Sequence, residues 1–434
     1  SICFLRGFQK NMLKDLFNPK VTIFITITIA FQILAMLSSY LDIGSNGLNK
    51  NPIKQFILFL IFLVCIGVHY IVVKCVINNN SNIMMFIKGN RVALFILLVF
   101  SYIQLLYLIS PSNFAIPVEI IGKYLEDHNY NSPWYEAGSY IQTLHRVNGL
   151  NTESGYLAAQ LLIIFVPFVL ASIKNRINIF SPKTAYNPLY FYLLLLSITI
   201  ILFCAKTTTG LLAILLMLLC LWLTLSWRRK ISFSILLLII GLVFFILATS
   251  SSYIMNVVND FVFNKISSDN QSTINRYGGT IALIVTWMKH FILGVGYGYH
   301  DYYLFQNVPT WATTNNEFQN SWLEYKFFPI LSIFFGWLTQ FGTVCVIFVL
   351  VYISKLLKDY RAFSKRIKLV ANENYDHKII DALRDSAHYF FCFYILISMF
   401  SFNWSDSAYL IMFFFFVVVR QNLKDIILLN KKDF

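Results

Sequence analysis

Two arginines and a glutamate occur at positions where they could bind a diphosphate group and the sugar attached to it. The stretch Ser139–Tyr156, which reads SYIQTLHRVNGLNTESGY, places Arg146 and Glu153 seven residues apart, directly before an apolar segment. Arg276 begins a second apolar segment further along the chain. A guanidinium group makes bidentate hydrogen bonds to phosphate oxygens and stays charged at physiological pH. Two such groups on one diphosphate would stabilise the negative charge that develops as it leaves.

Each of these residues also has a simpler interpretation. An arginine beside a membrane span can serve only as an anchor at the lipid headgroups. Glu153 is expected just after an N-cap at Asn151 or Thr152, where the helix dipole favours its ionised form, and an ordinary first-turn acid would occupy the same place. If Glu153 has a functional role, we expect it to orient Arg146 or to bind sugar hydroxyls, in preference to acting as a base.

Histidines, tyrosines and asparagines in the same regions could complete a substrate site. His145 and His300 are candidates for a general base. We expect the aromatic and amide side chains that follow residue 296 to be exposed, where they suit stacking on sugars and hydrogen bonds to their hydroxyls, although an interfacial aromatic belt would look the same. The predicted substrate-binding residues are Lys206, His145, His290, His300, Tyr297 and Asn316. No spacing of His, Cys and Asp matches a zinc or iron site, so we predict neither a metal nor another cofactor.

The elements that must position these residues are membrane helices. The chain has 434 residues, of which 58% are hydrophobic and 12% are charged. Its apolar runs reach about 20 residues, the length of an α-helical span and too long for barrel strands. We predict an all-α, polytopic integral membrane protein with a single membrane domain, and about ten spans, or about 11 to 12 if re-entrant segments are counted. The expected spans are 21–41, 53–73, 92–110, 154–172, 188–204, 210–227, 231–249, 331–354, 386–402 and 407–420.

Membrane orientation explains the net charge of +14, so no nucleic-acid partner is expected. With a cytoplasmic N-terminus, 25 of the 34 basic residues fall on the cytoplasmic side, as the positive-inside rule predicts. Both termini are then cytoplasmic. Two long loops, 111–153 and 250–330, face the other side, and we expect Pro111, Pro117 and Pro133 to break the first of them. The segment 355–385 is predicted to be a basic, solvated cytoplasmic loop.

The distribution of charge also bears on the class of protein. The spans hold few ionisable residues, whereas an ion-coupled transporter needs acids or bases within them. One of the exceptions, Lys206, lies in a short outer turn. Within the second outer loop, Asn275–Leu293 predicts an interfacial or re-entrant helix with Arg276 and His290 near one face. Gly294–Gly298 (GVGYG) lacks the preceding strand of a dinucleotide site and is expected to form a tight turn. The functional groups are therefore predicted at the outer membrane surface.

Four sequence blocks resemble the O-antigen polymerase and ligase superfamily. In chain order they are Arg146–Gly149 with Glu153–Tyr156, Lys206–Leu212 (KTTTGLL), Arg276 with Trp287 and Gly294–Tyr297, and Thr339–Gly342. Ligases of the superfamily usually carry a His-Asn pair shortly before the last of these glycines. This chain has Leu331 and Ser332 there, which favours a Wzy-type polymerase over a ligase.

The resemblance implies a GT-C-like membrane fold and a metal-independent, inverting glycosyl transfer. An oligosaccharide repeat unit on undecaprenyl diphosphate would pass to another lipid-linked unit at the periplasmic face of the bacterial inner membrane. Arg146 and Arg276 would bind the diphosphate, Lys206 would assist, and Glu153 would position Arg146 or the acceptor. The implied partners are these substrates, membrane lipid and a chain-length regulator protein. The alternatives are an O-antigen ligase, another polysaccharide polymerase of the superfamily, and a flippase or transporter for a lipid-linked glycan.

Overall fold

The fold is helical throughout the part of the chain that the structure describes. The computed structural model describes residues 19–43, 50–127, 133–182, 184–250, 271–370 and 376–429, and every regular element within these ranges is a helix. The all-α prediction is therefore confirmed for them. The chain forms two compact units. Unit 1 comprises Ser1–Asn82, Ile266–Tyr360 and Ser398–Phe434, and unit 2 comprises Ile83–Lys265 and Arg361–Ile397.

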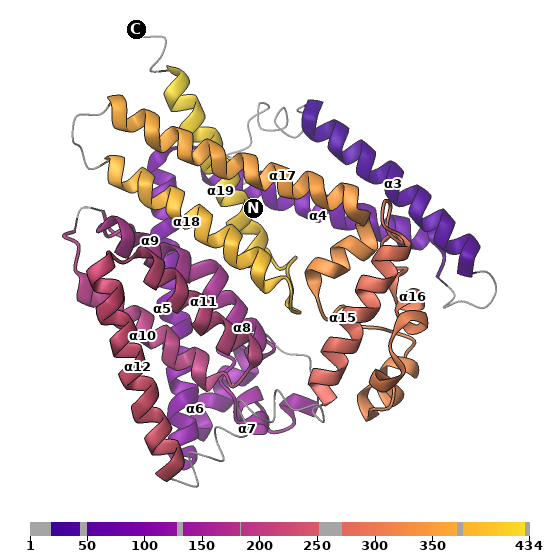
Figure 1. The fold of residues 1–434 in the computed structure, drawn as a ribbon, viewed down its shortest axis with the longest axis horizontal. Helices are drawn as coiled ribbons and strands as arrows, with labels where there is room; N and C mark the ends of the chain where they lie inside the picture. The colour runs from indigo at the N-terminus through magenta and orange to yellow at the C-terminus, as the bar shows by residue number, and fades with distance from the viewer. Residues whose placement is uncertain are drawn as a thin grey trace. The chain divides into compact units, whose positions relative to one another are not determined.

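Unit 1 is built on long helices from both ends of the chain. In it, α4 packs along both α3 and α19, as Figure 1 shows. Gln421 on α19 joins the α4 and α19 pair, because its Oε1 accepts hydrogen bonds from the Tyr70 hydroxyl (3.3 Å) and the Lys74 ammonium (2.8 Å). The elements of unit 1 are α3 (Pro19–Ile43), α4 (Pro52–Val76), α15 (Gln271–Lys289), α16 (His300–Asn307), η5 (Thr310–Ala312), η6 (Phe318–Leu323), most of α17 (Ile333–Val370) and α19 (Ser407–Leu429).

Unit 2 surrounds one buried apolar helix. This helix runs over Ser154–Asn175, and 89% of its most apolar stretch is buried inside the protein. It is the α8–η3–α9 segment, which widens into a π-turn before Pro167, a residue with no N–H to donate. Helices α10, α11 and α18 pack around it. The elements of unit 2 are α5 (Asn80–Ile109), α6 (Pro111–Tyr124), η2 (Pro133–Tyr135), α7 (Tyr140–Leu144), α8 (Ser154–Gln160), η3 (Leu161–Phe165), α9 (Val166–Asn175), α10 (Pro188–Cys204), α11 (Thr208–Thr224), α12 (Trp227–Ser250), the end of α17, and α18 (Asp376–Ile397).

Within the described residues, six helices are long and apolar enough to cross a membrane. They lie in α3, α4, α5, α8–α9, α17 and α19, and they coincide with six of the expected spans. Two further expected spans fall on the shorter apolar helices α10 and α11, each of 17 residues. The other two fall on α12 and α18. The protein is therefore a multi-pass membrane protein.

The prediction of a solvated loop at 355–385 is wrong for the described residues. Helix α17 continues to Val370 and α18 already begins at Asp376, while 371–375 lie outside the described residues. The physical reason is a buried apolar stripe on α17 at Leu356, Tyr360 and Phe363, which extends the helix beyond its hydrophobic span. Helix α18 also ends at Ile397, before the predicted end of the ninth span.

The prediction that prolines break the loop 111–153 is also wrong at Pro111 and Pro117. Pro111 starts helix α6, where its missing N–H is one that the helix leaves unused. Pro117 lies inside the same helix, which nevertheless continues to Tyr124. The segment is therefore partly helical, with α6 and the short α7 before the stretch that carries Arg146.

Helix α17 is interrupted at Gly342, whose φ of 75° and ψ of 168° are not helical. The turn that follows α15 occupies the interruption. Val295 N–H donates to the Thr339 carbonyl (2.8 Å), and Thr343 N–H donates to the Phe291 carbonyl (3.0 Å). A continuous helix would pair these groups of α17 within itself, so the turn satisfies backbone groups that the break exposes.

The turn itself is the one predicted from Gly294–Gly298. Its three glycines all have positive φ, and four residues separate it from the end of α15. Gln32 on α3 holds it against α17. The Gln32 amide donates to the Gln340 carbonyl (3.1 Å) and its Oε1 accepts from Tyr297 N–H (2.8 Å). The GVGYG turn, α3 and α17 therefore form one connected structure in unit 1.

Candidate functional site

A buried polar network in unit 2 holds residues 146–153 in place. At its centre is Gln104 on α5, whose side chain is fully buried. Gly149 N–H donates to Gln104 Oε1 (2.8 Å). The Gln104 Nε2 lies 2.8 Å from Glu126 Oε1 and 2.9 Å from both Asn148 Oδ1 and the Gly149 carbonyl. A hydrogen-bonded amide at the protein interior thus determines the path of the backbone that carries Arg146.

Glu126 is the buried acid of this network, and sequence analysis did not single it out. The Ser139 hydroxyl donates to Glu126 Oε1 (2.7 Å), and Tyr140 N–H donates to Glu126 Oε2 (3.3 Å). Burial raises the pKa of this carboxyl group, although the surrounding hydrogen bonds oppose the effect. The signal in the sequence was a polar glutamine inside a predicted span, because a buried amide there requires polar partners.

Replacing Gln104 by leucine should lower the free energy of unfolding of the purified protein by about 2–4 kcal/mol. Leucine has a similar volume, but it leaves the buried N–H and carbonyl of Gly149 without their hydrogen bonds to Gln104 and removes one of the hydrogen bonds to Glu126. Thermal unfolding in a neutral detergent would measure the loss. Gln142→Leu is a matched control, since no hydrogen-bond partner of the buried Gln142 Oε1 occurs in the described part of the chain. Equal stability of the two variants would contradict the prediction.

Arg146 and Lys206 are carried by neighbouring backbone segments of unit 2. Val147 N–H donates to the Cys204 carbonyl (3.2 Å), which joins the two segments. Arg146 and Lys206 are both half-buried, whereas His145 is exposed. His145 and Lys206 have left-handed backbone conformations, with φ of 53° and 54°. The structure therefore brings two predicted phosphate-binding cations into one region, although their positions in the sequence are 60 residues apart.

Glu153 caps helix α8, and the expected cap at Asn151 or Thr152 is wrong. The Glu153 backbone is extended (φ −143°, ψ 151°), which makes it the N-cap residue itself. The charges of Glu153 and Arg146 both affect the pKa of the nearby Tyr140 hydroxyl. Burial raises the pKa of Tyr140, the Arg146 charge opposes this shift, and the Glu153 charge adds to it. The two predicted site residues therefore act electrostatically on the same hydroxyl group.

In unit 1, Arg276 and Asn316 each follow a residue that takes part in the same side-chain hydrogen bond. Asn315 Nδ2 donates to Asn275 Oδ1 (2.6 Å), which joins the segment that carries Asn316 to the start of α15, where Arg276 follows Asn275. Arg276 is half-buried near the start of α15, and Asn316 is exposed. Gly278 on α15 approaches η5 so closely that a Cβ there would lie 2.3 Å from the Cβ of Ala312.

The predicted exposed run of aromatic residues after residue 296 is largely buried. Tyr299 and Tyr303 are 1% and 3% exposed. The Tyr297 ring stacks on Phe62 of α4, with ring centroids 5.6 Å apart. These rings therefore pack the interior of unit 1, because the GVGYG turn directs them towards α3 and α4. Trp311 remains exposed, as do the amide side chains of Asn316 and Asn320, so part of the predicted sugar-binding surface is retained.

The two histidines predicted in this region are buried or half-buried and contact other side chains. The His290 ring packs edge-on against Tyr303, with ring centroids 4.6 Å apart, and burial lowers its pKa. His300 is buried, and both its ring nitrogens are engaged: Gln340 Nε2 lies 3.0 Å from Nδ1, and Asp301 Oδ1 lies 3.2 Å from Nε2. To act as a base, His300 would have to release one of these contacts.

Acidification should destabilise the protein through His300. Burial lowers the pKa of His300 below its ordinary value, so the unfolded chain binds a proton that the folded chain does not. Stability is therefore lost as the pH falls below about 6.5, by up to about 1.4 kcal/mol per pH unit. Unfolding temperatures measured across this range would show the effect. His300→Gln should have a flatter profile, and an unchanged slope in that variant would contradict the assignment.

The predicted site residues are divided between the two units. Arg146, His145, Glu153 and Lys206 belong to unit 2, whereas Arg276, His290, Tyr297, His300 and Asn316 belong to unit 1. The convergence of Arg146 and Arg276 on one diphosphate thus stays a prediction. Among the described residues, no group of three or more His, Cys, Asp and Glu side chains could hold a metal ion.

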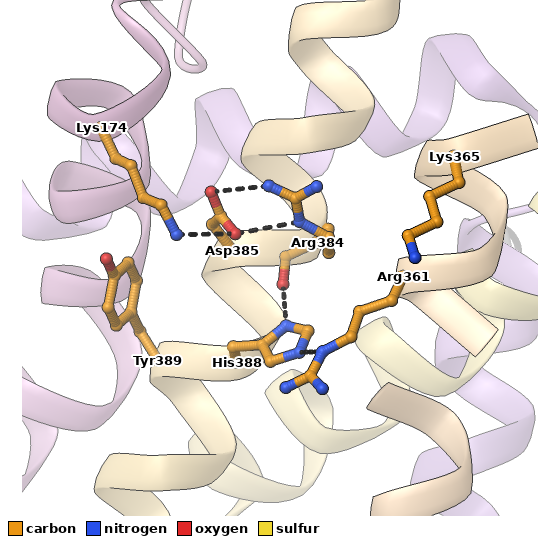
Figure 2. A pocket seen from close by; sticks show the side chains of 7 residues that line it. All are labelled: Lys174, Arg361, Lys365, Arg384, Asp385, His388 and Tyr389. Atoms are coloured by element: carbon orange, nitrogen blue, oxygen red, sulfur yellow. Dashed lines mark hydrogen bonds and ion pairs between the residues drawn. The ribbon is translucent and has the colours of Figure 1, made fainter. Parts of the chain in front are cut away.

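Sequence analysis missed a charged pocket in unit 2. Its volume is about 370 Å³, and α9, α17 and α18 contribute its lining (Figure 2). The pocket was missed because a loop was predicted at 355–385, whereas the lining of the pocket comes from two helices in this segment, α17 and α18. A signal was present in the paired cations at 361 and 365, one helical turn apart. The lining includes Lys174, Arg361, Lys365, Arg384, Asp385 and His388.

Residues 191–350 match the protein-family model described as O-antigen ligase. The matched part begins within α10 and ends within α17, so it contains Lys206, Arg276 and the GVGYG turn but not Arg146 or Glu153. A multi-pass helical protein with this match indicates a membrane function of the glycan polymerase or ligase type. Neither the curated proteins nor the solved structures compared with the chain include a match.

Proposed function

We propose that the chain is a glycosyltransferase that polymerises O-antigen repeat units at a membrane. The observation that supports a glycosyltransferase of the polymerase or ligase type is the family match over 191–350, which contains Lys206 and Arg276. The choice of a polymerase over a ligase rests on the sequence at Leu331 and Ser332. The enzyme would lie in the bacterial inner membrane, with both termini cytoplasmic and its active site periplasmic. The distribution of basic residues supports this orientation.

The proposed reaction transfers a glycan from one lipid to another. The acceptor hydroxyl oxygen forms a bond to the anomeric carbon of the donor glycan, and the bond from that carbon to the diphosphate breaks. Undecaprenyl diphosphate leaves with the bonding electrons, and the hydroxyl proton is released. Arg146 and Arg276 would stabilise the diphosphate charge, with Lys206 in support and Glu153 orienting Arg146 or the acceptor.

The buried network around Gln104 supports a binding role for Arg146. Fixed donors stabilise a developing charge more effectively than mobile ones, because they need not reorganise during the reaction. The Gln104 side chain holds both the N–H and the carbonyl of Gly149, three residues after Arg146. The proposal requires Arg146 of unit 2 and Arg276 of unit 1 to reach the same diphosphate.

A ligase is the second candidate, and the description of the matching family favours it. A ligase would transfer the finished glycan to a lipid core instead of to another repeat unit. The sequence favours the polymerase, because Leu331 and Ser332 occupy the place of the His-Asn pair that ligases of the superfamily usually carry. A polymerase would also be expected to work with a chain-length regulator protein.

Deletion of the gene separates these functions. Lipopolysaccharide capped with single repeat units indicates loss of a polymerase. Lipid-linked polymer that is absent from the lipid core indicates loss of a ligase. Absence of repeat units on the outer side of the membrane indicates loss of a flippase and would overturn the proposal. The chain itself, expressed from a plasmid, should restore the wild-type lipopolysaccharide.

A further inference from the structure

The pocket in unit 2 has more positive charge than its own residues neutralise. Four cationic side chains line it, from Lys174, Arg361, Lys365 and Arg384, together with a single carboxylate from Asp385 (Figure 2). The lining comes from the end of α9, the last turns of α17 and the first half of α18. These segments were all predicted on the cytoplasmic side of the membrane from their charge.

On one side of the pocket, the positive charges are neutralised by carboxylates of the protein. Asp385 is held by Lys174 (3.2 Å), by Asn175 (3.0 Å) and by two nitrogens of Arg384 (3.0 and 3.1 Å). The third nitrogen of Arg384 donates to Asp381 (2.9 Å). Lys174 and Arg384 are thus matched by two carboxylates, and this part of the lining needs no further anion.

Arg361 is held in place by a neutral group. His388 Nδ1 lies 2.7 Å from the Arg384 carbonyl, which can only accept, so Nδ1 carries the proton. The other nitrogen, Nε2, then accepts from Arg361 Nε (2.8 Å). A neutral imidazole orients the guanidinium without cancelling its charge, and the terminal nitrogens of Arg361 keep their bidentate donor geometry.

Lys365 adds a second unbalanced cation. It lies one helical turn after Arg361 on α17, where two like charges repel and destabilise the helix. Among the described residues, no carboxylate lies within ion-pair distance of either side chain. An anion bound between them would remove this repulsion.

We propose that this pocket binds the phosphate group of an anionic ligand through Arg361 and Lys365. An oriented guanidinium and a neighbouring ammonium are suited to phosphate oxygens. The volume of about 370 Å³ is many times the ~30 Å³ that one water molecule occupies in the liquid, so a phosphate with attached groups fits. The phosphate could belong to an acidic phospholipid headgroup or to a soluble phosphate compound. The site is separate from the proposed active site, which is predicted on the opposite face of the membrane.

The test uses the purified full chain in a neutral detergent, with thermal unfolding as the measurement. One arm adds inorganic phosphate, with chloride at equal ionic strength as the reference. The other adds phosphatidylglycerol, with phosphatidylcholine as the reference. A ligand that binds only the folded protein raises the unfolding temperature in a saturable manner. We expect such a rise in at least one arm, and the arm that responds identifies the source of the phosphate.

Two double variants with equal loss of charge decide whether the pocket is responsible. Arg361→Ala/Lys365→Ala should reduce the apparent affinity about tenfold or more. Lys358→Ala/Arg366→Ala removes two exposed cations of the same helix that do not line the pocket, and should bind like the wild type. Equal losses in both variants would mean unspecific attraction to a basic surface and would overturn the proposal. So would the absence of a rise in both arms for the wild-type chain.

Arg361→Lys refines the assignment to a bidentate contact. Lysine keeps the positive charge but loses both the hydrogen bond to His388 and the paired donors. We expect an affinity between that of the wild type and that of the double alanine variant. Wild-type affinity in Arg361→Lys would overturn the role of the oriented guanidinium.

Discussion

Replacement of Arg276 by alanine is expected to reduce glycan transfer by about 10²- to 10³-fold. In the proposed reaction the guanidinium binds the diphosphate leaving group, where a fixed positive charge stabilises the transition state more than the ground state. In a strain without its own copy of the gene, the variant should leave lipopolysaccharide with single repeat units. The amount of protein in the membrane should be unchanged, because Arg276 is half-buried and no described residue forms an ion pair with it.

The control for Arg276 is Lys289 at the other end of α15. Lys289 is exposed and donates to Asn307, and Lys289→Ala removes the same charge from the same helix. It should retain normal polymerisation. Arg276→Lys should restore part of the activity, since it keeps the charge and loses the bidentate geometry. Normal polymer from Arg276→Ala would refute the site assignment.

The same experiment tests whether Arg146 and Arg276 act on one group. If both bind a single diphosphate, losses of activity in the two single variants should not add in the double variant, because residues that act as a unit are strongly non-additive. Additive losses would indicate independent roles. This outcome would reject the convergence of the two arginines while leaving each one open to a separate function.

Gly342→Ala is expected to destabilise the protein by about 3 kcal/mol or more. Gly342 has a φ of 75° and a ψ of 168°, a conformation that residues with a side chain rarely adopt. A Cβ added there would lie 2.2 Å from the Ile292 carbonyl oxygen and 2.7 Å from Gly294 N. Both neighbours are backbone atoms of the GVGYG turn and its approach, so neither can move without displacing the turn. Thermal unfolding in detergent and the yield of membrane-inserted protein would measure the loss.

Gly67→Ala provides the comparison. Gly67 lies within α4, and a Cβ there would have no atom within 4 Å. Alanine has the higher helix propensity, so this variant should be neutral or more stable by up to about 1 kcal/mol. If Gly342→Ala were as stable as Gly67→Ala, the break in α17 and its pairing with the turn would not be as described.

Hydropathy predicted the membrane helices well because a span must be both apolar and long. Each of the ten expected spans falls at least in large part on a helix. The same measure failed at 355–385, because a helix that leaves the membrane is held by a narrow apolar stripe and not by an apolar run. Leu356 and Tyr360 are fully buried on such a stripe, among many charged neighbours. The mean hydropathy of a window over these residues is therefore polar, and it does not indicate a helix.

For the site, the sequence identified residue types better than it identified their surroundings. Lys206 and Arg146 were proposed as phosphate ligands, and a backbone hydrogen bond does join their segments. The tyrosines after the GVGYG turn were expected to be exposed, yet Tyr299 and Tyr303 are buried. Which way a side chain faces after a turn depends on the partners of that turn, and those partners come from α3 and α17, far away in the sequence.

The sequence alone determined the class of protein, the positions of most spans and the blocks with their arginines, because these depend on composition and on neighbours along the chain. Only the tertiary structure decided how Gln104 holds Gly149 and how the GVGYG turn fills the break in α17. It also decided that the last turns of α17 and the start of α18 enclose a cationic pocket with α9. These features join residues that are distant in the sequence, and buried polar groups must find partners wherever the fold places them.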